Sequence, residues 1–189
     1  MSMTSSVPGH GLTCDGFEAP LAKLSACHDR VGRQCAALRR LATQGVHDAA
    51  DEDASTVAAA VMRFFDTSAK DHHADEEADL FPALIESMAG SDAVCLREMI
   101  EASRAEHREL TRRWSALRPV LAALAGGQRA PLPSDAVDGF IDLYARHIAR
   151  EEAELLPMAG RLLGDADLER IAHAMRRRRG LDDEASSPT

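Results

Sequence analysis

The 189-residue sequence is poor in aromatic residues, which make up only 4% of it, whereas alanine and leucine abound. Because aromatic residues favour strands while alanine and leucine favour helices, this shortage argues against a β-rich fold. No apolar run approaches the length of about 18 residues that a transmembrane helix needs, so we expect no membrane-spanning segment. The N-terminal region has no apolar stretch after a basic start, so we expect no secretory signal.

The four cysteines lack the Cys-x2-Cys pairing typical of zinc sites and redox motifs. We interpret them as reduced thiols and expect a cytoplasmic protein. Acidic residues outnumber basic ones, so the formal net charge is −9. This negative charge argues against a general nucleic-acid-binding surface. The exception is the run Arg176–Arg179, which we interpret as the solvated basic end of a terminal helix.

The length suits a single domain with a core large enough to fold without disulfides. Serine, proline and glycine without apolar periodicity predict a flexible N-terminal tail at residues 1–16. A second flexible tail is expected at residues 181–189, which leaves residues 17–180 for the folded domain.

Apolar residues recur at three- and four-residue intervals in four long stretches, which is the pattern of helices that bury one face. The predicted helices span about residues 17–43, 54–89, 92–125 and 134–158, and a short fifth helix spans about residues 166–179. Long helices with short connections predict an all-α fold, an antiparallel up-down four-helix bundle with a short fifth C-terminal helix.

Two stretches of the chain have nearly the same sequence. One begins at His72 and the other at His147, and both read His-x3-Glu-Glu-Ala-(Asp/Glu)-Leu-(Phe/Leu)-Pro. Four residues of helix turn about 400°, so His72 lies on one stripe with Glu76, and His147 with Glu151. Charged groups are rarely buried unless they are paired or bind a metal, so the repeated pair predicts a metal site.

A further histidine precedes each copy of this motif. His28 stands 44 residues before His72, and His107 stands 40 residues before His147. The similar spacing indicates a duplicated helical hairpin, in which each copy contributes a histidine and then a His-x3-Glu pair. The predicted metal ligands are His28, His72, Glu76, His107, His147 and Glu151.

Imidazole and carboxylate ligands suit iron, and also zinc or manganese. Four histidines and two bridging glutamates supply about eight bonds, whereas two octahedral ions need about 12. The remaining positions allow an oxo or hydroxo bridge and exogenous ligands. An unsaturated pair of reducible metals suits O2, NO or peroxide, whereas a structural zinc site is closed and four-coordinate.

The order of the ligands separates two classes of di-iron protein. Ferritin-like sites use Glu-x-x-His, but no candidate histidine here has a glutamate three residues before it. The order His-x3-Glu, between lone histidines, resembles the hemerythrin-like (HHE cation-binding) family over about residues 17–158. The resemblance implies a non-haem di-iron centre held by the six residues, with Glu76 and Glu151 as the bridging candidates.

The sequence also departs from part of that family. Oxygen-carrying hemerythrins are similar but use a fifth histidine one turn from the helix-3 ligand, where this chain has Ser103 and Thr111. They also use an aspartate where this chain has Glu151. The set looks more like bacterial hemerythrin-like proteins, some of which repair iron–sulfur centres. Those repair proteins carry a cysteine-bearing N-terminal domain, and here only a short tail with Cys14 precedes the domain.

Several neighbours of the candidate ligands have two possible roles. His73 has the same spacing to Glu77 as His72 has to Glu76, so His73 is either a fifth ligand or a residue beside the centre. Glu77 and Glu152 lie on the helix flank or orient a ligand imidazole. Three aromatic residues either pack in the core or wall the ligand pocket: Phe65, Trp114 and Phe140. Tyr144 is either a core residue or a hydrogen-bond partner of a metal-bound oxygen, and Cys27 is either a buried core cysteine or a redox partner.

The sequence predicts a di-iron protein that binds O2 or NO, or that senses iron or redox state. The alternative is a di-iron enzyme acting on NO or peroxide, or in iron–sulfur repair. No nucleophile–base set, phosphate loop or dinucleotide motif requires an enzyme, and a purely structural bundle is a third possibility. We expect a small diatomic partner, no nucleic acid, no membrane, and a monomer or weak homodimer, because a lone bundle needs no second subunit.

Overall fold

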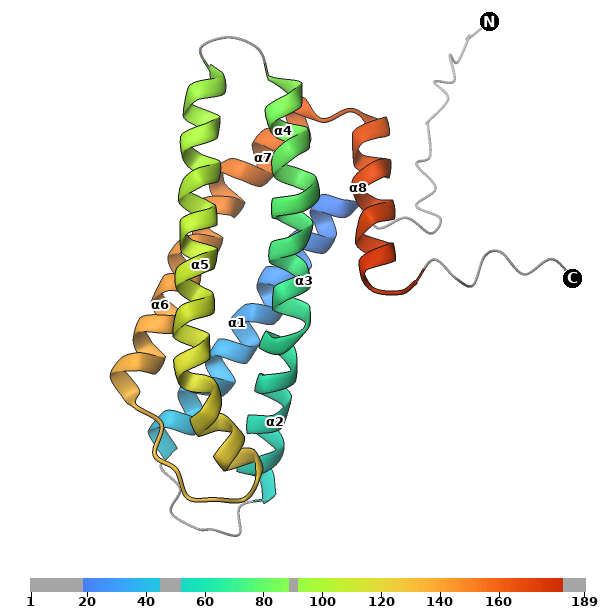
Figure 1. The fold of residues 1–189 in the computed structure, drawn as a ribbon. Helices are drawn as coiled ribbons and strands as arrows, with labels where there is room; N and C mark the ends of the chain where they lie inside the picture. Colours follow the sequence, from blue (N-terminus) through green and yellow to red (C-terminus); the bar gives the residue numbers. More distant parts are fainter. Residues whose placement is uncertain (1–18, 45–51, 89–91, 182–189) are drawn as a thin grey trace, which may run out of the picture.

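The computed structural model describes residues 19–44, 52–88 and 92–181, and every regular element within them is helical (Figure 1). The all-α prediction is therefore confirmed. The predicted tails lie outside the described residues, except for Leu181. The elements are α1 (Pro20–Gln44), α2 (Glu52–Asp66), α3 (Ser68–Asp75), α4 (Phe81–Ser87), α5 (Asp92–Ala125), α6 (Ser134–Arg150), α7 (Leu156–Leu162), α8 (Asp165–Arg178) and two π-helical turns, η1 (Glu76–Leu80) and η2 (Glu151–Leu155).

The helix boundaries follow local chemistry. Pro20 is the first residue of α1, where its missing N–H costs nothing. Gly127, just after the end of α5, has a positive φ of 75°, which glycine adopts without strain. Thr67 interrupts the predicted second helix between α2 and α3. The N-cap position of α6 is occupied by Pro133, which makes no side-chain capping bond.

The repeated motif contains a π-helical turn in both copies. The N–H of Phe81 donates to the carbonyl of Glu76, and the N–H of Leu156 donates to that of Glu151. Pro82 has no N–H and cannot make the regular α-helical hydrogen bond. The wider π-helical turn accommodates this proline within the helix. The helix therefore continues instead of ending at this proline. Single π-helical turns are frequent at functional sites.

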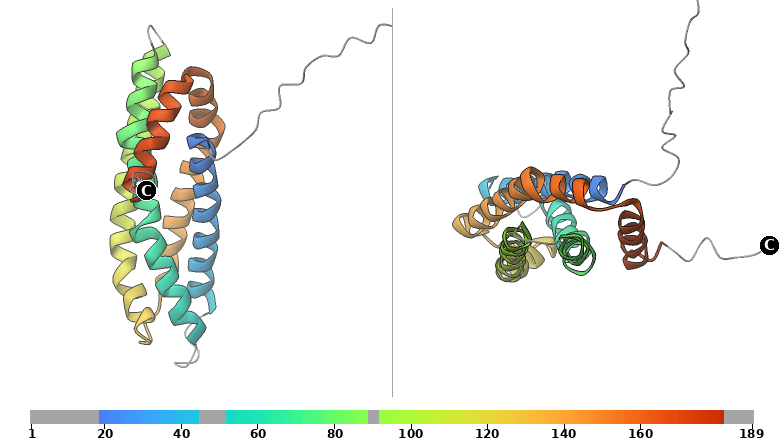
Figure 2. Two further views of the ribbon diagram at one scale, coloured as in Figure 1. Left: turned by 90° about the vertical axis from the view of Figure 1, so that its right-hand side faces the viewer. Right: turned by 90° about the horizontal axis from the view of Figure 1, so that it is seen from above.

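The long helices form a closed ring of neighbours. α1 packs against α2 and α6, and α5 packs against the same two helices (Figures 1 and 2). The core has two apolar clusters, one including Leu38, Phe65 and Phe140 and the other including Leu24 and Leu84. Along each long segment the predicted ligands fall between residues of the two clusters, so the polar site is a layer inside an apolar bundle.

The fifth helix, α8, lies outside the ring, against α1, α3 and η1 (Figure 2). Arg178 contacts Asp75 and Asp79, and Arg179 binds both oxygens of Asp75. The Asp75 side chain is fully buried. The interpretation of Arg176–Arg179 as a solvated basic end is therefore wrong for these two arginines, which hold α8 to the bundle through a buried carboxylate.

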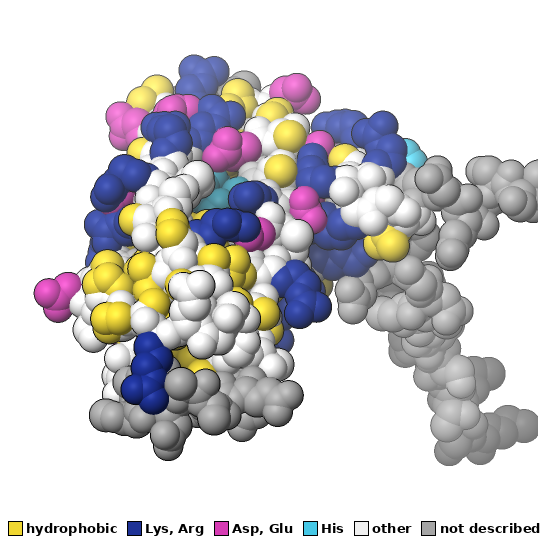
Figure 3. All heavy atoms as spheres, turned by 60° about the horizontal axis from the view of Figure 1, so that its bottom comes forward, with side chains coloured by type: hydrophobic (Ala, Val, Ile, Leu, Met, Phe, Trp, Pro, Cys, Tyr) yellow, Lys and Arg dark blue, Asp and Glu magenta, His cyan; other side chains and the backbone are white. Residues whose placement is uncertain are grey.

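The surface is mixed in charge. Figure 3 shows acidic and basic side chains spread over the face that it draws, with a histidine in a hollow among them. Among the described residues, no helix combines the length and the apolar character that crossing a membrane requires.

Candidate metal centre

The structure brings the six predicted ligands together in the layer between the apolar clusters. The Nε2 atoms of His28 and His72 lie 3.1 Å apart, and those of His107 and His147 lie 3.2 Å apart. None of the six side chains belongs to a residue that is more than 4% exposed. The histidines thus form two pairs, each joining a lone histidine to a motif histidine.

Both glutamates lie between the two pairs. Glu76 places Oε1 3.4 Å from Nε2 of His72 and Oε2 3.3 Å from Nε2 of His107. Glu151 places Oε2 3.3 Å from Nε2 of both His28 and His147. Each carboxylate therefore belongs to two groups of candidate ligands, as a residue that bridges two ions would.

The separations fit metal coordination. Ligand atoms about 2.1 Å from an octahedral ion are about 3 Å apart when they are neighbours in its shell. The nitrogen–nitrogen and nitrogen–oxygen distances in the cluster, 3.1 to 3.4 Å, are close to this value. Two ions sharing both carboxylates are thus compatible with the spacing of the side chains.

The hydrogen bonds inside the cluster are incomplete. All four carboxylate oxygens of Glu76 and Glu151 are buried without a hydrogen-bond partner among the described residues, and so is Nδ1 of His72. Burial, and then the nearby Glu151 carboxylate, raise the pKa of Glu76 well above its ordinary value. Buried carboxylates without partners are costly, and bound cations would satisfy these oxygens. The donor set therefore fits a metal.

Three of the four imidazoles are oriented by an outer carboxylate. Nδ1 of His28 donates to Glu152 at 2.6 Å, and Nδ1 of His107 donates to Glu77 at 2.7 Å. An ionised carboxylate only accepts, so Nδ1 carries the proton and the Nε2 lone pair faces the interior. The hypothesis that Glu77 and Glu152 orient ligand imidazoles thus agrees with the geometry.

The third outer carboxylate is Glu106, which sequence reasoning missed. It accepts from Nδ1 of His147 at 2.9 Å and is braced by Arg150 at 3.0 Å. The only hint in the sequence that Glu106 belongs to the site was its position next to His107. That signal is weak, because Glu106 acts across to a different helix, and spacing along one helix does not reveal such a contact.

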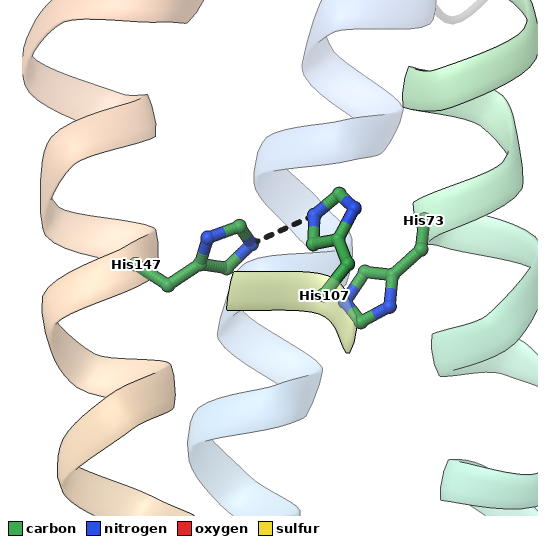
Figure 4. Close-up of side chains that lie close together, drawn as sticks. All are labelled: His73, His107 and His147. Carbon is green, nitrogen blue, oxygen red and sulfur yellow. Dashed lines mark hydrogen bonds between the residues drawn. The ribbon is translucent and has the colours of Figure 1, made fainter. Parts of the chain in front are cut away.

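The structure also positions the residues near the ligands for which the sequence left two roles open. The ring of His73 stacks on that of His107, with centroids 3.9 Å apart and planes 11° apart (Figure 4). Phe65 contacts both Trp114 and Tyr144 in the apolar cluster beside the site. Burial raises the pKa of Cys27, so its thiol stays protonated, which disfavours a thiolate redox role.

Known proteins resemble this chain both in a family model and in a whole sequence. The family model described as "Hemerythrin HHE cation binding domain" matches residues 19–159, a range that contains all six residues of the cluster. A protein of Haemophilus influenzae (strain ATCC 51907 / DSM 11121 / KW20 / Rd), described as an uncharacterized protein, is 31% identical over 140 residues. That match covers 72% of this chain and 76% of the other protein.

Proposed function

Because the chain belongs to the family of the hemerythrin HHE cation-binding domain, we propose that it holds two non-haem iron ions and binds O2 or NO at them. The family membership and the buried His/Glu groups support cation binding, for which iron is the common choice in this family. The observation that carries the proposal is the sharing of Glu76 and Glu151 between two groups of ligands.

In this proposal the four long helical segments form an antiparallel up-down bundle, in which each motif copy faces the other across the interior. His28 and His72 would hold one ion, and His107 and His147 the other. Six side chains do not fill two octahedral shells. When bound, the irons would supply open coordination positions and a reversible change of oxidation state.

The protein's own residues orient this site and bury it. Glu77, Glu106 and Glu152 hold the Nδ1 protons, which keeps the Nε2 lone pairs of three imidazoles directed inward. The apolar clusters on both sides of the layer shield it from water, and open hollows reach it beside His28 and His107. Such a site favours a small neutral ligand over a hydrated anion, which supports the binding of a diatomic molecule.

The first test is gas binding by the full chain loaded anaerobically with iron(II). The optical spectrum is recorded before and after addition of O2 or NO, and again after the gas is removed. Reversible spectral changes, with gas consumed in proportion to protein, are expected of a binding or sensing protein. Continued consumption of gas or peroxide with a reductant would instead support the di-iron enzyme alternative, and a protein that takes up no iron would exclude both.

A further inference from the structure

The duplicated motif places different residues at one equivalent position. His73 follows His72, and Ile148 follows His147. Both line a hollow in the surface. The hollow at His73 has a volume of about 430 Å³ and includes the ligand candidate His107, whereas the one at Ile148 has about 690 Å³ and includes His28. Repetition of the hairpin therefore creates two comparable hollows, each lined by one of the candidate ligands.

The residues at these two hollows differ in chemistry. The Nε2 atom of His73 is buried and has no hydrogen-bond partner among the described residues, whereas Ile148 offers no polar side-chain atom. Four residues after the lone histidine of each hairpin, one hollow has Thr111 and the other has Gly32. A buried nitrogen without a partner is costly, so it points to a ligand that completes its hydrogen bonding.

A small cavity adjoins the hollow at His73 and reaches residues of the apolar cluster beside the candidate ligands. It has a volume of about 30 Å³ and shares Lys70, His73 and Thr111 with that hollow. Its deeper wall includes Phe65, Trp114 and Tyr144. About 10–15 Å³ suffices for one water-sized molecule, so a diatomic molecule fits. The aromatic wall suits an apolar occupant.

His73, His107 and His147 each have a nitrogen within 4.8 Å of the others and form a further group of candidate ligands, but the orientation of His73 argues against direct coordination. Its ring lies parallel to that of His107 at 3.9 Å and nearly perpendicular to that of His147 at 5.9 Å (Figure 4). Imidazoles that bind one ion point their nitrogens at a common centre, whereas two stacked parallel rings point along parallel lines. His73 is thus better placed to contact a molecule beside the ion than to bind the ion.

We propose that the exogenous ligand, a neutral diatomic molecule, enters through the hollow at His73 and is held beside the His107–His147 pair by the Nε2 atom of His73. The inference rests on the proposed function and makes the two halves of the centre unequal. The half with His107 and His147 takes the ligand, while the hollow at Ile148 is not used for entry.

The test measures NO binding to the reduced, iron-loaded full chain by stopped-flow spectroscopy, with the iron content of every variant determined in parallel. His73→Leu should keep its iron but release NO about tenfold faster, because one hydrogen bond is lost. His73→Gln retains a polar side chain and should restore part of the difference. Ile148→Leu is the matched control at the equivalent position and should release NO at the wild-type rate.

Entry is tested separately by filling each hollow. Thr111→Phe should slow NO association at least about tenfold, whereas Gly32→Phe in the other hollow should leave it unchanged. A Cβ added at Gly32 meets no heavy atom within 4 Å, so the control substitution begins in open space.

Each failure has a distinct meaning. Wild-type protein that binds no iron or no NO would overturn the proposed function itself. Wild-type binding with unchanged rates in His73→Leu and Thr111→Phe would overturn only this inference. Loss of iron in His73→Leu would show that His73 is a ligand, and slower association in Gly32→Phe would place entry on the other side; both results contradict the proposal.

Discussion

The Nε2 atoms of His28 and His72 come from different helices and lie 3.1 Å apart in the protein interior. His28 carries its proton on Nδ1, where Glu152 accepts it, so the Nε2 lone pair of His28 faces His72. Burial lowers the pKa of His72 well below its ordinary value, which keeps this imidazole neutral. Such an interior is better stabilised by a cation than by a proton, and this makes metal content and stability interdependent.

Removal of metal should therefore destabilise the fold. A ligand that binds only the folded state at a thousand times its Kd stabilises it by about 4 kcal/mol. Thermal unfolding of iron-loaded and chelator-treated protein, followed by circular dichroism, measures the difference. The iron-loaded sample should melt at the higher temperature, and equal midpoints would show that the cluster is stable without a cation.

Substitution of a shared carboxylate should affect both ions. Glu76→Ala or Glu151→Ala should sharply reduce bound iron, because each glutamate belongs to both groups of ligands. The helical circular dichroism should be largely retained. Glu154→Ala is a suitable control, since this exposed residue of η2 lies outside both groups. Full iron retention in both variants would exclude the bridging assignment.

The outer carboxylate Glu106 should tune the centre without binding metal. Glu106→Gln removes the charged acceptor of the His147 proton, and loss of such a partner typically costs 10- to 100-fold in metal affinity. Competition with a chromophoric chelator measures the change. Glu98→Gln, at an exposed position of α5, serves as the control. An unchanged affinity for Glu106→Gln would mean that the orientation of His147 does not depend on this contact.

The buried carboxylate of Asp75 should make α8 important for stability. Removing both arginines in Arg178→Ala/Arg179→Ala leaves a fully buried carboxylate without its cations. Breaking a buried ion pair in this way typically costs about 3–5 kcal/mol. Urea unfolding measures the loss. Arg177→Ala, at an exposed position of the same helix, should cost much less, and similar losses in both proteins would contradict the special role of Asp75.

The sequence predicts the features that depend on local spacing. The 3.6-residue period of the helix places His72 and Glu76 on one stripe, and the duplication brings in His147 and Glu151. The helix boundaries at α1, α5 and α8 depend on proline, glycine and apolar periodicity, so they fall within a few residues of the prediction. In each case the deciding interaction is within one helix or one repeat.

Local spacing in the sequence does not predict features that depend on contacts between helices. Glu106 acts on His147 from a neighbouring helix, and Arg178 reaches Asp75 across 103 positions of sequence. The π-helical turns are an intermediate case, because Pro82 indicates a disturbance but not the bonding that resolves it. The hollow at His73 is lined by residues of α3, η1 and α5. The spacing of residues along the chain does not reveal how these three elements pack together.

The most direct test of the account is the iron content of the wild-type chain together with its Mössbauer spectrum. The account predicts two irons per chain, magnetically coupled because Glu76 and Glu151 lie between them. A single iron, two uncoupled irons, or one four-coordinate zinc would contradict the shared-carboxylate centre and leave the bundle with a different metal site.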